Sequence, residues 1–182
     1  LKNAPPPAKA GGAVFMASPL SGIEATVLTV IDGHYQPSTS HTLPQGVTVT
    51  AVAALADDGE SENSVLASDP VIALNAAFSD SAVDIAIASK TELEKPIVIR
   101  LVTTGPHSSY PRIRVSIGDH VKALIVESHE GGVASSLVNS VFEMRMGDHV
   151  KIDHLRLNIA DPSSTVLTSF GGAMGRDSHY HG

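Results

Sequence analysis

The pentapeptide Gly-Asp-His-Val-Lys occurs twice, at residues 118–122 and again at residues 147–151, so the second copy begins 29 residues after the first. The same shift places Arg112–Ile117 on Val141–Met146. In both segments apolar residues alternate with polar ones, as in a strand that has one buried and one solvated face. A period of this length indicates stacked repeats, each of which buries its apolar face only against its neighbours.

Two fainter copies extend the repeat. Gly175–Ser178 follows the second pentapeptide at nearly the same interval, and Ser89–Leu93 precedes the first. Short β-rich runs also recur after residue 82, at 83–88, 97–103, 112–117, 121–127, 137–146, 150–159 and 164–170. We therefore predict a β-helix, with an antiparallel meander or sandwich as the alternative.

The first part of the chain has a different composition and lacks the repeat. Residues 1–22 include a proline-rich stretch and are expected to be a linker or disordered. Residues 23–81 are predicted to form a small mixed α/β region, and the β-helix rungs occupy residues 82–182. The elements expected in the mixed region are a strand over 24–31, an Asp32-Gly33 turn, a return strand over 34–36, a strand over 47–52, a possible short helix ending near 57–59 and a helix over 71–78.

Composition excludes several classes of function. The net charge of −7 and the absence of clustered Lys and Arg argue against nucleic-acid binding. No apolar run reaches the length of a membrane span, so we expect a soluble chain with no membrane partner. The sequence contains no Cys, which fits a reducing, cytoplasmic compartment and means that this chain offers no thiolate to a metal or cluster.

Two sets of residues invite a metal hypothesis. Asp119 and Asp148 would stack in a solenoid and could bind calcium, although an Asp that follows Gly in a tight turn is explained more simply by turn geometry. His179 and His181 would point to one face of a strand, but solvated strand histidines are the simpler interpretation. His120 and His149 are expected to face solvent. We predict no metal site.

Catalytic patterns are weak. No Gly-x-Ser-x-Gly elbow is present, and Ser128-His129-Glu130 is not a triad merely because the three letters are adjacent. His154 is expected to be an interior, hydrogen-bonded histidine. A β-helix enzyme acting on polysaccharides would need acidic groups that converge on one groove. The candidate acids share no common spacing: Asp84, Glu92, Glu127, Glu143 and Asp153. We therefore predict no catalytic residue and no enzyme.

Several segments, taken in order, resemble SufD, a subunit that works with SufB and the SufC ATPase in iron–sulfur cluster assembly. The segments that carry the resemblance are Leu28–Tyr35, Leu43–Val49, Ala73–Phe78, Glu94–Ile97, Val126–Gly131 and Asp153–Asn158. The resemblance spans roughly residues 24–182 and implies a right-handed parallel β-helix preceded by a partly helical region.

The resemblance implies a scaffold rather than a catalyst. It implies pairing with a SufB-like subunit, recruitment of a SufC-like ATPase through a C-terminal region beyond Gly182, and an iron–sulfur cluster only in the assembled complex. A chain of the SufD family is longer, so we expect a fragment that binds no cofactor itself and whose open β-helix end favours a homodimer. The alternatives are a polysaccharide-active β-helix enzyme and a calcium-stabilised solenoid.

Overall fold

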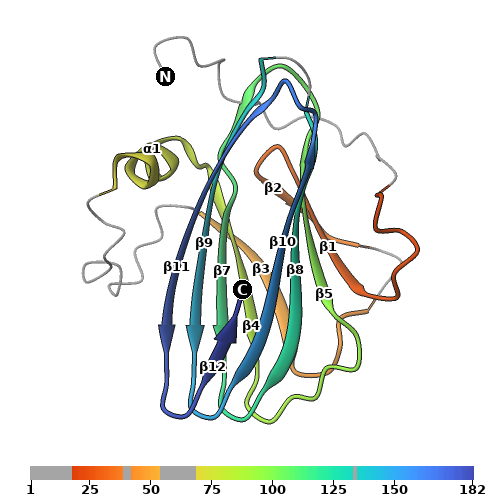
Figure 1. Ribbon diagram of the computed structural model, residues 1–182, viewed down its shortest axis with the longest axis vertical. Helices are drawn as coiled ribbons and strands as arrows, with labels where there is room; N and C mark the ends of the chain where they lie inside the picture. The colour runs from red at the N-terminus through yellow and green to blue at the C-terminus, as the bar shows by residue number, and fades with distance from the viewer. Residues whose placement is uncertain (1–17, 39–41, 54–68, 133–134) are drawn as a thin grey trace.

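The two runs of alternating apolar residues become neighbouring strands of a β-solenoid. The computed structural model describes residues 18–38, 42–53, 69–132 and 135–182, which form about three turns of solenoid (Figure 1). Its elements are β1 (Thr26–Ile31), β2 (His34–Gln36), β3 (Val47–Ala53), α1 (Pro70–Phe78), β4 (Ser81–Ile87), β5 (Ile97–Thr103), β6 (Ser108–Ser109), β7 (Arg112–Ile117), β8 (Lys122–Gly131), β9 (Leu137–Met146), β10 (Lys151–Ala160), β11 (Thr165–Met174) and β12 (His179–His181). The predicted β-helix is confirmed.

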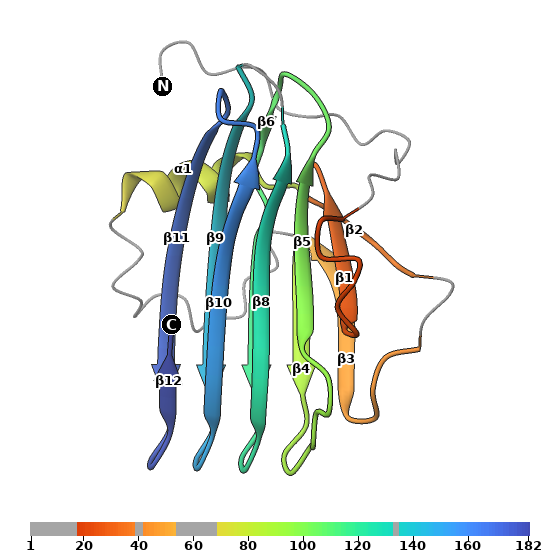
Figure 2. The same cartoon turned by 45° about the vertical axis from the view of Figure 1, so that its right-hand side comes forward.

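The strands build two sheets that face each other (Figure 2). One sheet has the order β12-β10-β8-β5-β1-β2, and the other has the order β11-β9-β7-β4-β3 with β6 beside β9. The pairs that stack turn on turn are parallel, whereas β1–β2 and β3–β4 are antiparallel. Because β1 and β3 lie in the same two sheets as the later strands, these two early strands contribute directly to the solenoid. The boundary near residue 82 stays a prediction.

The strand register has the period expected from the sequence. Ile113 pairs with Phe142, and Ala123 pairs with Ile152. The Asp32-Gly33 turn also forms, with φ of 50° and 90°, and β2 follows it. The Ala-rich stretch considered as a short helix lies mostly outside the described residues.

Inward-facing aliphatic and aromatic side chains fill the space between the sheets. The largest fully buried ones include Ile85, Ile97, Ile99, Ile113, Ile125, Phe142 and Met144. Each turn supplies a few of them, so no turn buries its apolar face alone. Burial of such side chains is the main stabilising contribution of the fold.

Helix α1 packs on the outside of the second sheet, against β9 and β11 (Figures 1 and 2). It begins as predicted, with Asp69 as the N-cap accepting the amide of Val71 at 2.7 Å and Pro70 in the first turn. Asn75 fixes it to the sheet, because its buried Nδ2 donates to the carbonyls of Pro111 and Asn139. Among the described residues, no helix has the length and apolar character needed to cross a bilayer.

The repeated pentapeptide forms the corner of each turn. Positions equivalent to its His adopt the left-handed conformation in every turn: Lys90, His120, His149 and Asp177 have φ of 61°, 57°, 58° and 53°. The Asp119 carboxylate accepts the amide of Asp148 at 2.8 Å, and Asp148 accepts the amide of Arg176 at 2.8 Å. The geometry of the corner thus explains why the Gly-Asp pair and the left-handed position recur in the pentapeptide.

Candidate functional site

Ionisable side chains enter the solenoid interior on β8 and β10. Alternate residues of β8 face inward, and after Ala123 and Ile125 the next inward positions are Glu127 and His129. Glu127 is 0% exposed and His129 is 1% exposed. On β10 the inward residues include His154 and Arg156, and Arg156 pairs in register with Glu127. We call Glu127, His129, His154, Arg156 and Tyr180 the interior network.

Glu127 is the centre of the interior network. Its Oε1 accepts a hydrogen bond from His129 Nε2 at 2.9 Å, and its Oε2 accepts one from Arg156 Nε at 2.9 Å. His154 Nε2 lies 3.5 Å from Oε2, which is an ion-pair distance rather than a hydrogen bond. Because an ionised carboxylate only accepts, His129 donates through Nε2, and its buried Nδ1 has no hydrogen-bond partner.

These contacts keep Glu127 ionised. Burial raises the pKa of the Glu127 carboxyl, but the contacts with His129 and His154 and the charge of Arg156 outweigh burial and hold that pKa well below its ordinary value of 4.5. Arg156 is therefore neutralised by a carboxylate on the preceding turn, and the interior contains a compensated ion pair instead of an isolated charge.

An aromatic frame surrounds His154. Its Nδ1 lies 2.9 Å from Tyr180 Oη, and its ring centroid lies 4.8 Å from that of Phe142 and 5.6 Å from that of Phe170. Burial raises the pKa of the Tyr180 hydroxyl. The charge of Arg156 opposes this shift and the negative charge of Glu127 adds to it, so the pKa stays above its ordinary value. The contact of Tyr180 with His154 joins β12 to β10. The contact of Arg156 with the Glu127 carboxylate joins β10 to β8 on the preceding turn.

The interior network holds protonatable groups, yet its carboxylate is already shared between an imidazole and a guanidinium. Within the described part of the chain, no group of three or more His, Asp or Glu side chains could hold a metal ion. The geometry suits a polar connection between two turns of the solenoid.

No family model and no curated protein matches this chain.

The adjacent letters Ser128-His129-Glu130 do not form a triad. His129 faces inward, whereas Ser128 and Glu130 lie on the outer face, where Ser128 Oγ donates to Glu130 Oε1 at 2.6 Å. Arg100 also donates to Glu130, with Nη2 at 2.8 Å from Oε2, and Ser18 Oγ lies 3.1 Å from Oε1. This outer cluster attaches Ser18 to β8.

The scattered acids lie apart, and four of the five have separate basic partners. Asp84 accepts from Arg114 Nε at 2.6 Å, and Glu143 accepts from Arg112 Nη2 at 3.0 Å, both on the outer face of the second sheet. The remaining acids lie elsewhere: the backbone of Glu92 forms an isolated β-bridge with that of Lys122, Glu127 is interior, and Asp153 Oδ1 lies 3.3 Å from His181 Nδ1. They do not converge on one groove.

The metal candidates lie on the surface. Asp119 and Asp148 use their carboxylates on backbone amides, and Asp148 also accepts from Arg176 Nη2 at 2.7 Å. His179 and His181 are exposed, since Tyr180 between them faces inward. His120 and His149 are exposed as expected, and they also stack on each other, which the sequence did not predict.

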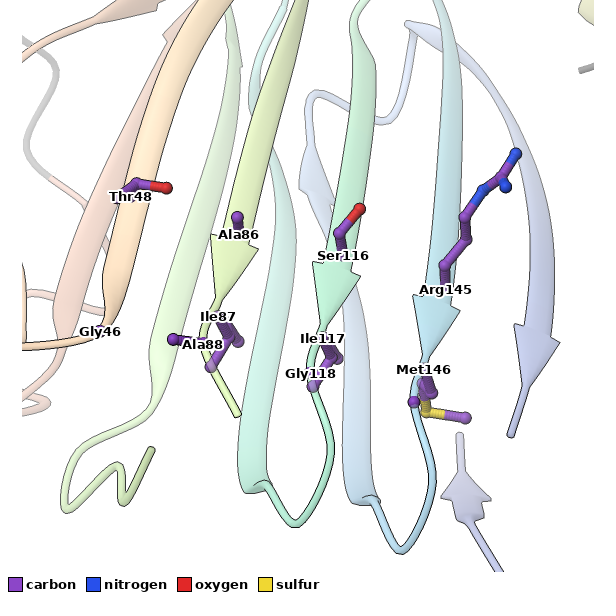
Figure 3. Close-up of a pocket in the computed structure, with 11 residues that line it drawn as sticks. Gly46, Thr48, Ala86, Ile87, Ala88, Ser116, Ile117, Gly118, Arg145 and Met146 are labelled. Atoms are coloured by element: carbon purple, nitrogen blue, oxygen red, sulfur yellow. The ribbon is translucent and has the colours of Figure 1, made fainter. Parts of the chain in front are cut away.

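A shallow pocket of about 480 Å³ crosses the outer face of β3, β4, β7 and β9 (Figure 3). Its floor consists of small side chains, including Thr48, Ala86 and Ser116, and the side chain of Arg145 extends at one end (Figure 3). No acidic residue and no His lines it. The pocket therefore lacks the residues of an acid–base centre.

The interior network is the feature that sequence reasoning missed. The strand predicted at 121–127 extends to Gly131, because its polar end is buried against partners instead of leaving the sheet. A signal was present, since the 29-residue shift places Glu127 on Arg156, an opposite charge at an inward position. His154 is interior and hydrogen-bonded, as predicted.

Proposed function

We propose that this chain is a SufD-like scaffold subunit of a SufBCD-type complex for iron–sulfur cluster assembly. In this role it positions partner subunits and the nascent cluster and catalyses no reaction. The observation that carries the proposal is the agreement between the solenoid fold and the segments that resemble SufD, because those segments occupy the positions that hold the solenoid together.

The placement of four of these segments supports this interpretation. Leu28–Tyr35 contains the end of β1, its turn and the start of β2, which close one end of the first sheet. Ala73–Phe78 supplies Asn75, which fixes α1. Val126–Gly131 and Asp153–Asn158 supply Glu127, His129, His154 and Arg156, so they provide four of the five residues of the interior network.

A scaffold role also agrees with the side-chain chemistry. The sequence has no Cys, so any thiolate that holds a nascent cluster comes from a partner subunit. In this proposal the solenoid contacts a SufB-like subunit, a SufC-like ATPase is recruited by a region outside this sequence, and the complex works in the cytoplasm. An unpaired edge strand of the sheets, such as β11, would also allow a homodimer.

The two alternatives are less well supported. For a polysaccharide-active enzyme, the acids would have to face one another across a groove, whereas Asp84, Glu127, Glu143 and Asp153 are each in contact with a basic group. For a calcium-stabilised solenoid, the corner carboxylates would have to be available to the ion. Addition of a chelator should leave the unfolding temperature unchanged, whereas a calcium solenoid would lose stability.

Affinity co-purification tests the proposal. The full-length product of the gene that encodes this chain would be tagged and co-expressed with SufB-like and SufC-like proteins from the same source, with a second culture that lacks the SufB-like protein. We expect both partners to be retained in the first culture. Purification of the tagged protein without either partner would contradict the proposal and leave only a shared architecture.

A further inference from the structure

The two copies of the pentapeptide place an imidazole at the same point of adjacent corners. His120 and His149 are exposed, and their rings stack with centroids 4.8 Å apart and an interplanar angle of 10°. Their backbones are nearly identical, with φ of 57° and 58°. The two side chains therefore begin from equivalent positions on neighbouring turns and extend into solvent side by side.

The backbone beneath the two rings is held by hydrogen bonds between turns. His120 N donates to Asp148 O at 2.9 Å, and His149 N donates to Arg176 O at 2.8 Å. The Asp119 carboxylate adds a bond to the amide of Asp148 at 2.8 Å. These hydrogen bonds fix the backbones of His120 and His149 relative to each other. A ligand that bridges the two imidazole rings therefore does not have to order the backbone.

A carboxylate lies on the same row. Asp177 occupies the equivalent corner position of the next turn, and its Oδ2 lies 3.8 Å from His149 Nδ1. Both side chains are open to solvent, with 77% of Asp177 and 50% of His149 exposed. Imidazole nitrogen and carboxylate oxygen are the donors that first-row divalent metal ions prefer in proteins without thiolates.

We propose that His120 and His149 form a two-histidine surface site for a first-row divalent transition-metal ion, with Asp177 next to it. The stacked rings must turn about their Cβ–Cγ bonds to direct one nitrogen each at a shared ion, and these torsions are broad for histidine. The interior network is not suited to this role, because Arg156 already contacts its carboxylate. The site does not depend on the proposed scaffold function.

Zinc titration of the purified chain tests the site. Calorimetry should give binding of Zn²⁺ to the wild-type chain, and His120→Asn or His149→Asn should weaken it about a hundredfold, because each removes one arm of a chelate. Asn tolerates the left-handed conformation and so preserves the corner. Circular dichroism of each variant would verify that the fold is retained. Binding should also weaken with acid, since protons compete for the imidazoles.

The chain contains its own matched control. His179 and His181 are a second exposed pair on β12, and the double variant His179→Asn/His181→Asn should bind Zn²⁺ as the wild type does. Loss of binding in this control together with unchanged binding in the corner variants would overturn the proposal. Absence of Zn²⁺ binding to the wild-type chain would overturn it as well.

Discussion

Glu127 Oε2 accepts a hydrogen bond from Arg156 Nε at 2.9 Å, and the two residues occupy the same inward position on successive turns. The pair adds a charge contact to an interior that is mostly aliphatic and aromatic, and this contact specifies which residue of one turn lies above which residue of the next. A polar contact of this kind penalises a shifted register, because a shift would bury an unpaired charge.

Loss of the carboxylate should destabilise the fold. We expect Glu127→Gln to reduce the free energy of unfolding by about 2–4 kcal/mol, since Arg156 and the two histidines lose their shared charge while Arg156 keeps some access to water. Urea denaturation followed by circular dichroism measures the change. Glu24→Gln is the matched control, because Glu24 is 85% exposed and its contact with Lys95 is 3.4 Å. Equal stability of the two variants would argue against the interior network.

The same carboxylate should give the protein an acid-sensitive stability. The pKa of Glu127 lies below its ordinary value of 4.5, so the unfolded chain takes up the proton first as pH falls. The contribution of the Glu127 carboxylate to the free energy of unfolding is complete above pH 4.5. This contribution is lost as the pH falls from 4.5 toward the lower pKa of Glu127 in the folded chain. Denaturation at a series of pH values should therefore give a shallower acid slope for Glu127→Gln than for the wild type. Identical slopes would contradict the assignment.

The corner requires close approach of the turns at Gly118. A Cβ added there would lie 2.5 Å from Ser89 N and 2.9 Å from Ser89 Cα, and neither backbone atom can move freely. We expect Gly118→Ala to reduce the free energy of unfolding by about 1–3 kcal/mol through overpacking. Gly22→Ala is the control, since nothing lies within 4 Å of its added Cβ. A thermal melt in which both variants match the wild type would show that the corner tolerates a side chain.

Two side-chain amides attach α1 to the sheet: that of Asn75, and that of Asn139, whose Nδ2 donates to Val71 O at 2.9 Å. Asn75 Nδ2 is the donor to two carbonyl oxygens, at 3.2 Å from Pro111 O and 2.7 Å from Asn139 O. Asn75→Ala would leave both carbonyls without this donor, so we expect a loss of about 2–4 kcal/mol and faster hydrogen exchange of the α1 amides. Asn158→Ala, at an exposed position of β10, should change stability by no more than about 0.5 kcal/mol. Unchanged exchange in α1 would contradict this role of Asn75.

The sequence was informative where burial is apolar. The alternation of Ile113, Val115 and Ile117, repeated one period later, predicted stacked repeats and favoured a β-helix over an antiparallel meander or sandwich, because apolar residues at every second position fill the interior between two sheets. It was less informative where the interior is polar. Glu127 and His129 are polar residues that are common in loops. The strand continues through them because Glu127 bonds to Arg156 on the next turn and to His129 on its own strand.

Side-chain contacts between turns were also difficult to predict. The two pentapeptides were apparent, but the stacking of His120 on His149 depends on a left-handed backbone at both positions. The repeat fixes which residues are neighbours, whereas the rotamers that bring rings or charges into contact depend on local packing. The interior network required the same information, since Tyr180 reaches His154 from a different strand.

The mass of the purified complex is the most direct test of the scaffold proposal. Native mass spectrometry would be applied to the tagged full-length protein after co-expression with SufB-like and SufC-like partners. We predict a discrete assembly whose mass requires this protein together with a SufB-like subunit and a SufC-like ATPase. A spectrum that contains only the protein alone or as a homodimer, with both partners expressed and folded in the same cells, would contradict the proposed function.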